Sequence, residues 1–298
     1  MRVIETVEEM RFARAELAPP VALVPTLGGL HAGHEALLTE ARGRAAVVVA
    51  SLFLNPTQFD DAADLDSYPR DRARDLEIFK RNGVDIVFAP TVEEIYPVGA
   101  ETSVDPGLIG RVLEGRSRPG HFSGVATVVA KLLALIRPDV AFFGAKDAQQ
   151  LVIVRRLVRD LLLGAEVAEV PTVRDEDGVA LSSRLGLLDD AGRHAAATIY
   201  RALSRGEALF RDGVRDAAEL RQAVMDELAK ESLVDVEYVS VADPELLTEL
   251  EEAGEGALMS LAADVGGVRL IDNVVLRSAI GAGKGGRASM SPPNETAR

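Results

Sequence analysis

The residues of this chain most suited to chemistry are two histidines, His31 and His34, in the segment Pro25–His34, PTLGGLHAGH. The apolar run Val21–Val24 precedes this segment and Glu35–Arg42 follows it with a helical pattern, which predicts a strand, a glycine-rich turn and a helix start. The N-terminus of a helix carries unpaired N–H groups and the positive end of the helix dipole, which suit phosphate. Two imidazoles three residues apart share one helix face. The segment therefore predicts a site for a nucleotide triphosphate.

Two other interpretations of the histidine pair stay open at this point. An H-x-x-H pattern also occurs as a plain helix-cap region with stacked rings, or as a pair of metal ligands. A metal site would need an acidic partner at ligand spacing, and the sequence offers none nearby. The glycines of the segment fit phosphate better than metal.

A second polar strand end lies at Gln58. The run Ala46–Leu54 leads into Asn55 and Pro56, and a residue before proline is held out of the helical conformation, so the chain turns here. Gln58 then lies at the carboxyl end of the strand, where its amide can both donate and accept, as a hydroxy-acid substrate requires. A turn-stabilising amide is the competing interpretation.

A third strand end, after Val140–Phe143, carries Gly144, Lys146 and Asp147, and a helix begins there. Lys146 suits phosphate because the N-terminus of that helix lies behind it, and Asp147 suits ribose or serves as an N-cap. Gln150, one turn further on, faces the same crevice.

Two later segments complete the candidate site. Leu181–Arg184, LSSR, offers two hydroxyls and a guanidinium for polyphosphate oxygens, although a surface turn with an N-cap serine would show the same pattern. Asp60–Arg74 is polar and mixed in charge, which predicts an exposed mobile loop.

Bulk composition limits the class of protein. The 298 residues have a net charge of −14, so the chain should repel nucleic acid and anionic membranes. The sequence has no cysteine, which excludes disulfides and thiolate nucleophiles and fits a reducing compartment. It has no signal peptide and no run of 18 apolar residues, so we expect a cytoplasmic protein with no membrane partner.

Apolar runs alternate with helical patterns through the first 170 residues, which predicts a doubly wound parallel sheet, an α/β Rossmann-like fold. The expected strands are Val21–Val24, Ala46–Leu54, Ile86–Ala89, Val140–Phe143 and Glu166–Val170. The expected helices are Gly33–Gly43, Asp71–Asn82, Gly124–Arg137 and Asp147–Leu163. Ligands bind such folds at the carboxyl ends of the strands, where the unusual turns lie.

Beyond the polar turn at 175–178 the pattern changes to two long helices, Asp189–Arg211 and Asp216–Lys230, followed by three strand-like runs, Val234–Val241, Ala257–Ala262 and Val268–Asn273. We therefore expect a nucleotide- and substrate-binding domain over 1–173, a smaller α+β domain over 174–280 that closes over the active site, and a disordered tail over 281–298, because that tail is rich in Gly, Ser and Pro.

Taken in order, these motifs resemble those of the pantoate–β-alanine ligase (pantothenate synthetase) family, within the nucleotidyltransferases that carry an H-x-G-H signature. The resemblance runs from about Val21 to Asp189 and more loosely to Asn273. Its motifs are PTLGGLHAGH, NPTQF, Tyr68-Pro69-Arg70, EGRSRPGHFSGVATVV, FGAKDAQQL and LSSR. H-x-G-H alone is shared more widely, whereas this succession is specific.

The resemblance implies a two-step reaction with ATP, pantoate and β-alanine as substrates, Mg²⁺ as cofactor and a homodimer as the assembly. Pantoate is adenylated with release of pyrophosphate, and the amine of β-alanine then displaces AMP to give pantothenate. No protein nucleophile is needed, and the enzyme must place donors and positive charge at the phosphates.

The resemblance also assigns roles by position. His34 is the donor at the α-phosphate, and His31 and Lys146 hold the phosphates. Val173 meets adenine through its backbone, and the loop 60–74 lies over the site. The catalytic set is His31, His34, Lys146, Ser182, Ser183 and Arg184. The ATP set adds Leu27, Gly28, Gly29, Leu30, Gly33, Gly144, Ala145, Asp147, Val173 and Leu181. The pantoate and β-alanine set is Pro25, Gln58, Tyr68 and Gln150.

Four positions depart from the family pattern. Leu27 replaces the usual Met, Ala145 a Glu, Ala148 a large residue such as Tyr, and Leu185 an Asn. Leu for Met nearly conserves volume, whereas Ala145 and Leu185 weaken the expected support of Lys146 and Arg184. Two alternatives follow: an adenylyltransferase acting on another small hydroxy acid, and a paralogue that binds ATP without turnover.

Overall fold

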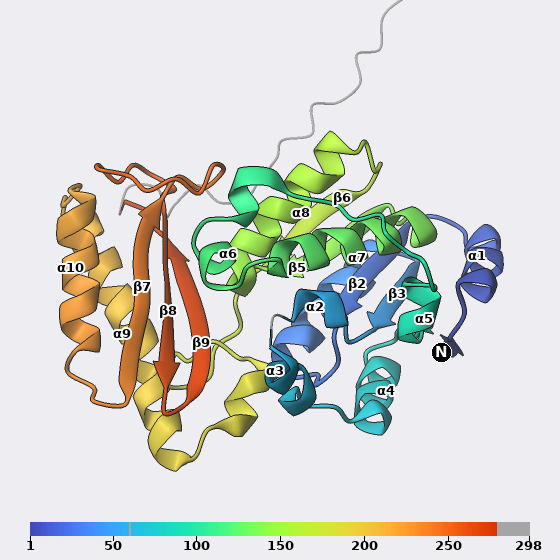
Figure 1. The fold of residues 1–298 in the computed structure, drawn as a ribbon, viewed down its shortest axis with the longest axis horizontal. Helices are drawn as coiled ribbons and strands as arrows, with labels where there is room; N and C mark the ends of the chain where they lie inside the picture. The colour runs from blue at the N-terminus through green and yellow to red at the C-terminus, as the bar shows by residue number, and fades with distance from the viewer. Residues whose placement is uncertain (60, 279–298) are drawn as a thin grey trace, which may run out of the picture.

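The computed structural model describes residues 1–59 and 61–278 of the chain, so the tail expected over 281–298 lies outside the described residues. Six strands form one parallel sheet in the order β1-β4-β3-β2-β5-β6 (Figure 1). The doubly wound α/β prediction is confirmed. The strands are β1 (Arg2–Ile4), β2 (Val21–Thr26), β3 (Val47–Leu52), β4 (Ile86–Phe88), β5 (Val140–Gly144) and β6 (Glu166–Val170).

Helices cover both faces of this sheet. One face packs against α1 (Val7–Glu16), α7 (His121–Ile136) and α8 (Ala148–Asp160), and the other against α2 (Ala32–Arg44) and α4 (Arg72–Arg81). Alternate residues of a strand enter different cores: Leu23 of β2 joins the first and Val24 the second. Both faces are therefore buried, which explains why β2 is a continuous apolar run in the sequence.

The sequence did not predict β1, α1 or the short helices that precede residue 173. Residues 60–74 also differ from the expected plain loop, because they contain the helix α3 (Ala62–Ser67), capped by the Asp61 carboxylate, and the start of α4. The remaining short helices are η1 (Pro56–Gln58), α5 (Val92–Ile95), η2 (Gly107–Gly110), α6 (Glu114–Ser117), η3 (Ala145–Asp147) and η4 (Ser183–Leu187).

A second, antiparallel sheet is built from β7 (Val234–Ala242), β8 (Leu258–Val265) and β9 (Val268–Val275). The long helices α9 (Asp190–Arg211) and α10 (Ala217–Leu228) pack on its outer face (Figure 1). Polar side chains of this sheet, namely Tyr238, Ser260, Arg269 and Asn273, line a cavity shared with the parallel-sheet part of the chain. These two helices and three strands lie where the sequence predicts them, within three residues at each end.

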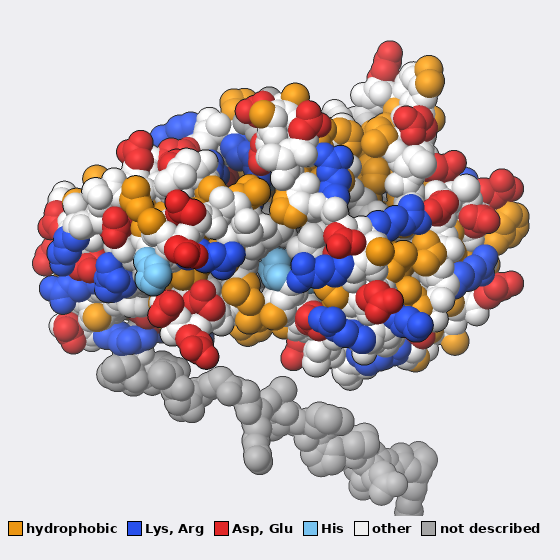
Figure 2. Space-filling model, turned by 90° about the horizontal axis from the view of Figure 1, so that it is seen from below, with side chains coloured by type: hydrophobic (Ala, Val, Ile, Leu, Met, Phe, Trp, Pro, Cys, Tyr) orange, Lys and Arg blue, Asp and Glu red, His pale blue; other side chains and the backbone are white. Residues whose placement is uncertain are grey.

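The chain has a net charge of −14. Figure 2 shows acidic and basic side chains interspersed over one face of the molecule. None of the helices in the described part of the chain is long and apolar enough to cross a bilayer.

Candidate functional site

The candidate site lies at the carboxyl ends of β2 and β5, where the strand order of the parallel sheet reverses direction. Chain connections leave these two strands toward opposite sides, which opens a crevice between them. Two adjoining cavities of about 200 and 210 Å³ fill this crevice and the space below the antiparallel sheet. Both are lined by His34 and Lys146, which follow β2 and β5 respectively.

Backbone donors fix the state of the two histidines at the start of α2. The Gly33 N–H donates to His31 Nδ1 at 3.1 Å, and the His31 N–H donates to His34 Nδ1 at 3.3 Å. A backbone N–H can only donate, so each Nδ1 must be unprotonated and each neutral ring carries its proton on Nε2. Both histidines therefore present an Nε2–H donor as the remaining polar atom of the ring.

Both histidines stay neutral at physiological pH. Burial, helped by the nearby Lys146 cation, lowers the pKa of His31 to about 4. Burial and the neighbouring His31 lower the pKa of His34 to about 3. The rings lie 4.2 Å apart between centroids. The pair is thus suited to hydrogen-bond donation and unsuited to carrying positive charge.

The glycine turn differs from the expected phosphate cradle. The N–H groups of Gly29 and Leu30 donate to the carboxylate of Asp75 at 3.0 and 2.9 Å, and Gly33 N–H is taken by His31. Within the described chain, the two cavities are lined by Leu27, His31, Gly33 and His34 of this segment, but not by Gly28, Gly29 or Leu30. Phosphate would therefore meet side chains here, because the N–H groups of Gly29, Leu30 and Gly33 are already occupied.

Gln58 projects one defined end of its amide into the cavity. The Asn55 side chain accepts from Thr57 N–H and Tyr96 O–H through Oδ1, so its Nδ2 donates to Gln58 Oε1 at 3.0 Å. Asn55 is fully buried. Gln58 lines both cavities, and since its Oε1 is taken by Asn55, its Nε2 is the amide atom available to a ligand. Gln58 backbone C=O accepts the Nδ1–H of His121 at 2.7 Å, which gives that cavity-lining ring the opposite tautomer, with an unprotonated Nε2.

Lys146 is held by both sheets. Its ammonium lies 3.5 Å from the carboxylate of Asp147, and the turn that carries it is bound by Asn273 of β9, whose Nδ2 donates to the backbone carbonyls of Ala145 and Lys146 at 3.0 and 2.8 Å. Asn273 is positioned in turn by Asp272, which accepts a bidentate ion pair from Arg174. The antiparallel sheet thus holds the backbone of the turn that carries Lys146, the cation that the sequence predicts for phosphate.

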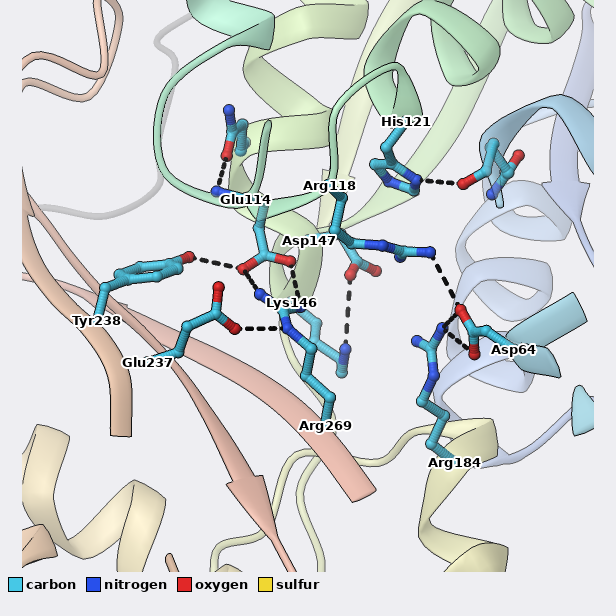
Figure 3. Close-up of polar contacts among 12 residues, drawn as sticks. Asp64, Glu114, Arg118, His121, Lys146, Asp147, Arg184, Glu237, Tyr238 and Arg269 are labelled. Atoms are coloured by element: carbon cyan, nitrogen blue, oxygen red, sulfur yellow. Dashed lines mark hydrogen bonds and ion pairs between the residues drawn. The ribbon is translucent and has the colours of Figure 1, made fainter. Parts of the chain in front are cut away.

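Asp64 of α3 joins two arginines at the rim of the cavity (Figure 3). It accepts from Arg184 at 2.9 and 3.0 Å and from Arg118 at 3.0 Å. Next to it, Tyr68 is largely buried and its hydroxyl lies 3.5 Å from Ser183 Oγ, which donates to the Gly29 carbonyl at 2.9 Å. The segment 61–70 therefore borders the cavity: Tyr68 lines it, Asp64 binds Arg184 of LSSR, and the Pro69 carbonyl lies next to Gly29.

A second ion pair crosses the cavity further out. Glu114 of α6 accepts a bidentate pair from Arg269 of β9 at 2.7 and 2.8 Å and a hydrogen bond from Tyr238 O–H at 2.9 Å (Figure 3). Burial and the Glu114 carboxylate raise the pKa of Tyr238 well above its usual range, so it remains a donor. Gln149 holds Glu114 from behind through the Glu114 N–H at 3.0 Å.

Most of the predicted site residues are gathered by these cavities. Those that line at least one of them are Pro25, Leu27, His31, Gly33, His34, Gln58, Tyr68, Gly144, Lys146, Asp147, Gln150, Val173, Leu181, Ser182, Ser183 and Arg184. Ala145 lines neither cavity, and its carbonyl accepts the Asn273 amide. Sequence reasoning missed Asn55, Asp75, Glu114, Arg118 and His121. Asp75 had a signal, since it is an acidic residue on the same helix face as buried Ile78 and Phe79.

Comparison with known proteins agrees with this arrangement. Residues 2–275 match the family described as pantoate–β-alanine ligase. The chain belongs to the pantoate–β-alanine ligase family. A pantothenate synthetase from Herpetosiphon aurantiacus is 47% identical over 93% of this chain and 100% of its own length. The likeness stated from the motifs is thereby confirmed.

Solved structures of family members have the same fold. The pantothenate synthetase of Thermus thermophilus superposes with a TM-score of 0.88 at 44% identity, over 93% of this chain and all of that one. The pantoate–β-alanine ligase of Francisella tularensis, complexed with β,γ-ATP and β-alanine, superposes at 0.77 with 33% identity, over 92% and 97% of the two chains.

Two of the departures from the family pattern find an explanation in the structure. Ala145 is bound through its backbone carbonyl, so the loss of a side chain at this position leaves the contact with Asn273 intact. Leu185 is buried in the core of the antiparallel sheet, and Arg184 is oriented instead by Asp64. Nothing in the structure explains Ala148.

Proposed function

We propose that this protein condenses pantoate with β-alanine to form pantothenate, with cleavage of ATP to AMP and pyrophosphate. Membership of the ligase family supports the reaction, and the F. tularensis relative, complexed with β,γ-ATP and β-alanine, supports two of the substrates. The observation that carries the proposal is the pair of neutral Nε2–H donors, His31 and His34, facing Lys146 across the crevice.

In the first step a carboxylate oxygen of pantoate attacks the α-phosphorus of ATP, and the bond to pyrophosphate breaks. Negative charge grows on the α-phosphate and on the leaving oxygens. The His34 Nε2–H donates to the α-phosphate there, and His31, Lys146 and Arg184 hold the departing phosphates. Preorganised donors of this kind act without moving a proton, which suits rings that are neutral.

The polar residues at the other end of the crevice hold the acid. Gln58 Nε2 and Gln150 bind pantoate beside Pro25 and Tyr68, and Gln58 also borders the position for β-alanine. Val173 meets adenine through its backbone, and Ser182 and Ser183 donate to phosphate oxygens. In the second step the amine of β-alanine attacks the acyl carbon, and AMP leaves.

Magnesium is proposed to arrive with ATP. The described residues contain no group of three side chains that would hold a metal on their own, which fits an ion bound mainly by phosphate oxygens and water. Asp147 lines the cavity and has one 3.5 Å contact with the Lys146 ammonium, whereas Glu114 and Asp272 each accept a bidentate pair from an arginine. Asp147 is therefore the residue suited to add one carboxylate ligand. When bound, the ion neutralises charge on the leaving pyrophosphate.

We also propose that the chain divides at about residue 173 into the two domains expected from the sequence, and that it works in the cytoplasm as a homodimer. The separate hydrophobic core around α9, α10 and the antiparallel sheet supports the division. The family resemblance supports the other two. Limited proteolysis near 174–178 and light scattering on the purified protein test the division and the dimer.

The reaction is tested by measuring pyrophosphate, AMP and pantothenate with ATP, pantoate and β-alanine, each omitted in turn. We expect pyrophosphate with ATP and pantoate, and AMP release once β-alanine is added. A panel of other hydroxy acids serves as the control. Pyrophosphate with another acid and none with pantoate would favour an adenylyltransferase of different specificity. ATP binding without turnover would favour an inactive paralogue.

A further inference from the structure

Asp75 is a buried carboxylate directly behind the glycine turn. Its side chain is 2% exposed, and its two oxygens accept the Gly29 N–H at 3.0 Å and the Leu30 N–H at 2.9 Å. It belongs to α4, on the face that carries Ile78 and Phe79 into the core. An apolar residue at this position would suit that face without the cost of burying a charge.

The carboxylate has a local task that an apolar residue cannot perform. Gly28 and Gly29 have φ values of +97° and +64°, so two successive peptide groups turn their N–H groups toward the interior. Buried N–H groups without acceptors are costly, and a carboxylate satisfies two of them through charge-assisted bonds. Asp75 thus selects this conformation of the turn.

The turn is clamped from its opposite side as well. The Gly29 carbonyl accepts the Ser183 Oγ–H at 2.9 Å, while the Gly29 N–H is bound by Asp75. A Cβ at Gly29 would come within 3.0 Å of the Pro69 carbonyl. Both peptide groups that flank Gly29 are therefore fixed.

The Asp75 hydrogen bonds are linked to the histidine pair through the backbone of Leu30 and His31. Leu30, bound by Asp75, is followed by His31, whose N–H donates to His34 Nδ1. A change in the Leu30–His31 peptide moves the His31 N–H and with it the ring of His34. The negative charge also keeps phosphate away from the turn, so the triphosphate is confined to the side of the Nε2–H donors and Lys146.

We propose that Asp75 is a positioning residue for adenylation: it sets the glycine turn, and through the turn it aims the His31 and His34 donors at the phosphates. The inference rests on the proposed function. It adds a residue that touches no substrate and acts through the backbone of Gly29 and Leu30.

The test is Asp75→Asn, which keeps the size of the side chain but leaves one oxygen and places an NH₂ group against a backbone N–H. We expect kcat for pyrophosphate release to fall about 10–100-fold, since misplacement of about 1 Å costs this much. We expect KM for pantoate and ATP to change less than about threefold, because the binding groups remain. Imidazole ¹⁵N signals of His31 and His34 should shift in the ligand-free protein.

The matched control is Asp216→Ala, which removes the N-cap of α10, the helix that packs on the antiparallel sheet. Asp216 accepts the Ala218 and Glu219 N–H groups at 2.8 and 2.9 Å, so its loss lowers stability without touching α4 or the glycine turn. We expect its kcat within about twofold of wild type. An equal fall in kcat for both variants would overturn the proposal, as would Asp75→Asn with full kcat and unshifted histidine signals.

A second variant covers the case in which Asp75→Asn does not fold. Asp75→Ser leaves space for a formate ion. We expect added formate to restore kcat of this variant at least about fivefold and to leave kcat of Asp216→Ala unchanged. Absence of rescue in folded Asp75→Ser would contradict a role for the carboxylate. Wild-type turnover is measured first, so failure of the proposed reaction is seen separately, and the histidine signals still test Asp75.

Discussion

The tautomers and pKa values of the histidines can be measured directly. The sequence has four histidines, and the hydrogen bonds assign His31 and His34 as Nε2–H, and His121 and His194 as Nδ1–H, because the latter two lie 2.7 Å from backbone carbonyls. Long-range ¹H–¹⁵N spectra distinguish the two tautomers, and a single substitution of each histidine assigns the signals. The pattern of two rings of each kind is the expected result.

The same spectra give the extent of protonation as pH falls. At pH 5.5 an imidazole with the ordinary pKa of 6.5 is about 90% protonated. His31, whose pKa burial lowers to about 4, should be only about 3% protonated at that pH, and His34, lowered to about 3, still less. Both signals should therefore stay in the neutral position between pH 8 and pH 5.5.

The shifts also predict how stability depends on pH. Below pH 6.5 His31 and His34 become protonated in the unfolded chain but stay neutral in the folded chain. The free energy of unfolding therefore falls as pH falls toward the folded pKa values. The full slope is about 1.4 kcal/mol per pH unit for each group, and we expect roughly half of it here because both side chains border a wet cavity. The double variant His31→Gln/His34→Gln, which cannot titrate, should show a flatter profile in urea unfolding.

Three results would refute this reasoning. The first is protonation of His31 or His34 with a midpoint near pH 6.5. The second is an Nδ1–H signal from either ring. The third is a stability profile of the double variant parallel to that of wild type between pH 6.5 and pH 5. Any of them would mean that the pair carries charge or is turned around, and the donor role proposed for His34 would fail.

Three substitutions test other parts of the site. His34→Ala should lower the rate of pyrophosphate release by about 10²–10³, as for the loss of one transition-state donor, and near wild-type turnover would refute the role. Gly124→Ala should raise KM for pantoate, because a Cβ there would lie 2.3 Å from the Thr57 carbonyl and displace Gln58; unchanged KM in folded protein would contradict this. Asp64→Ala removes charge-assisted bonds to Arg184 and Arg118, so it should speed amide exchange in Ala62–Ser67 and raise KM for ATP about tenfold. Unaltered exchange would show that α3 is held by other contacts.

Local patterns of the sequence were sufficient for the sheet and for the ends of its central strands. Because β2, β3 and β5 are buried on both faces, their apolar runs are clear in the sequence, and the polar residues that follow them must lie at the same edge of the sheet. His34, Gln58 and Lys146 were found in this way. The short edge strand β1 has too few residues to give such a pattern.

Contacts between segments far apart in the chain could not be predicted from the sequence. Glu114 and Arg269 are 155 residues apart, and neither lies in a pattern that predicts an ion pair. The occupied N–H groups of the glycine turn were missed for the same reason, because their acceptor, Asp75, comes from a helix 45 residues later. In an isolated turn these N–H groups would be free to bind phosphate. In the folded protein the Asp75 carboxylate already accepts them.

The contact of Asn273 with the turn of Lys146 has a consequence for how this site tolerates sequence change. The amide binds main-chain carbonyls, which every residue type possesses, so position 145 can vary while the lysine stays in place. The residue that must be retained is then Asn273, together with the strand β9 that positions it. A chimera that joined the parallel-sheet part to the antiparallel sheet of another protein would keep the histidines and Lys146. It would lose the Asn273 hydrogen bonds that hold the turn carrying Lys146.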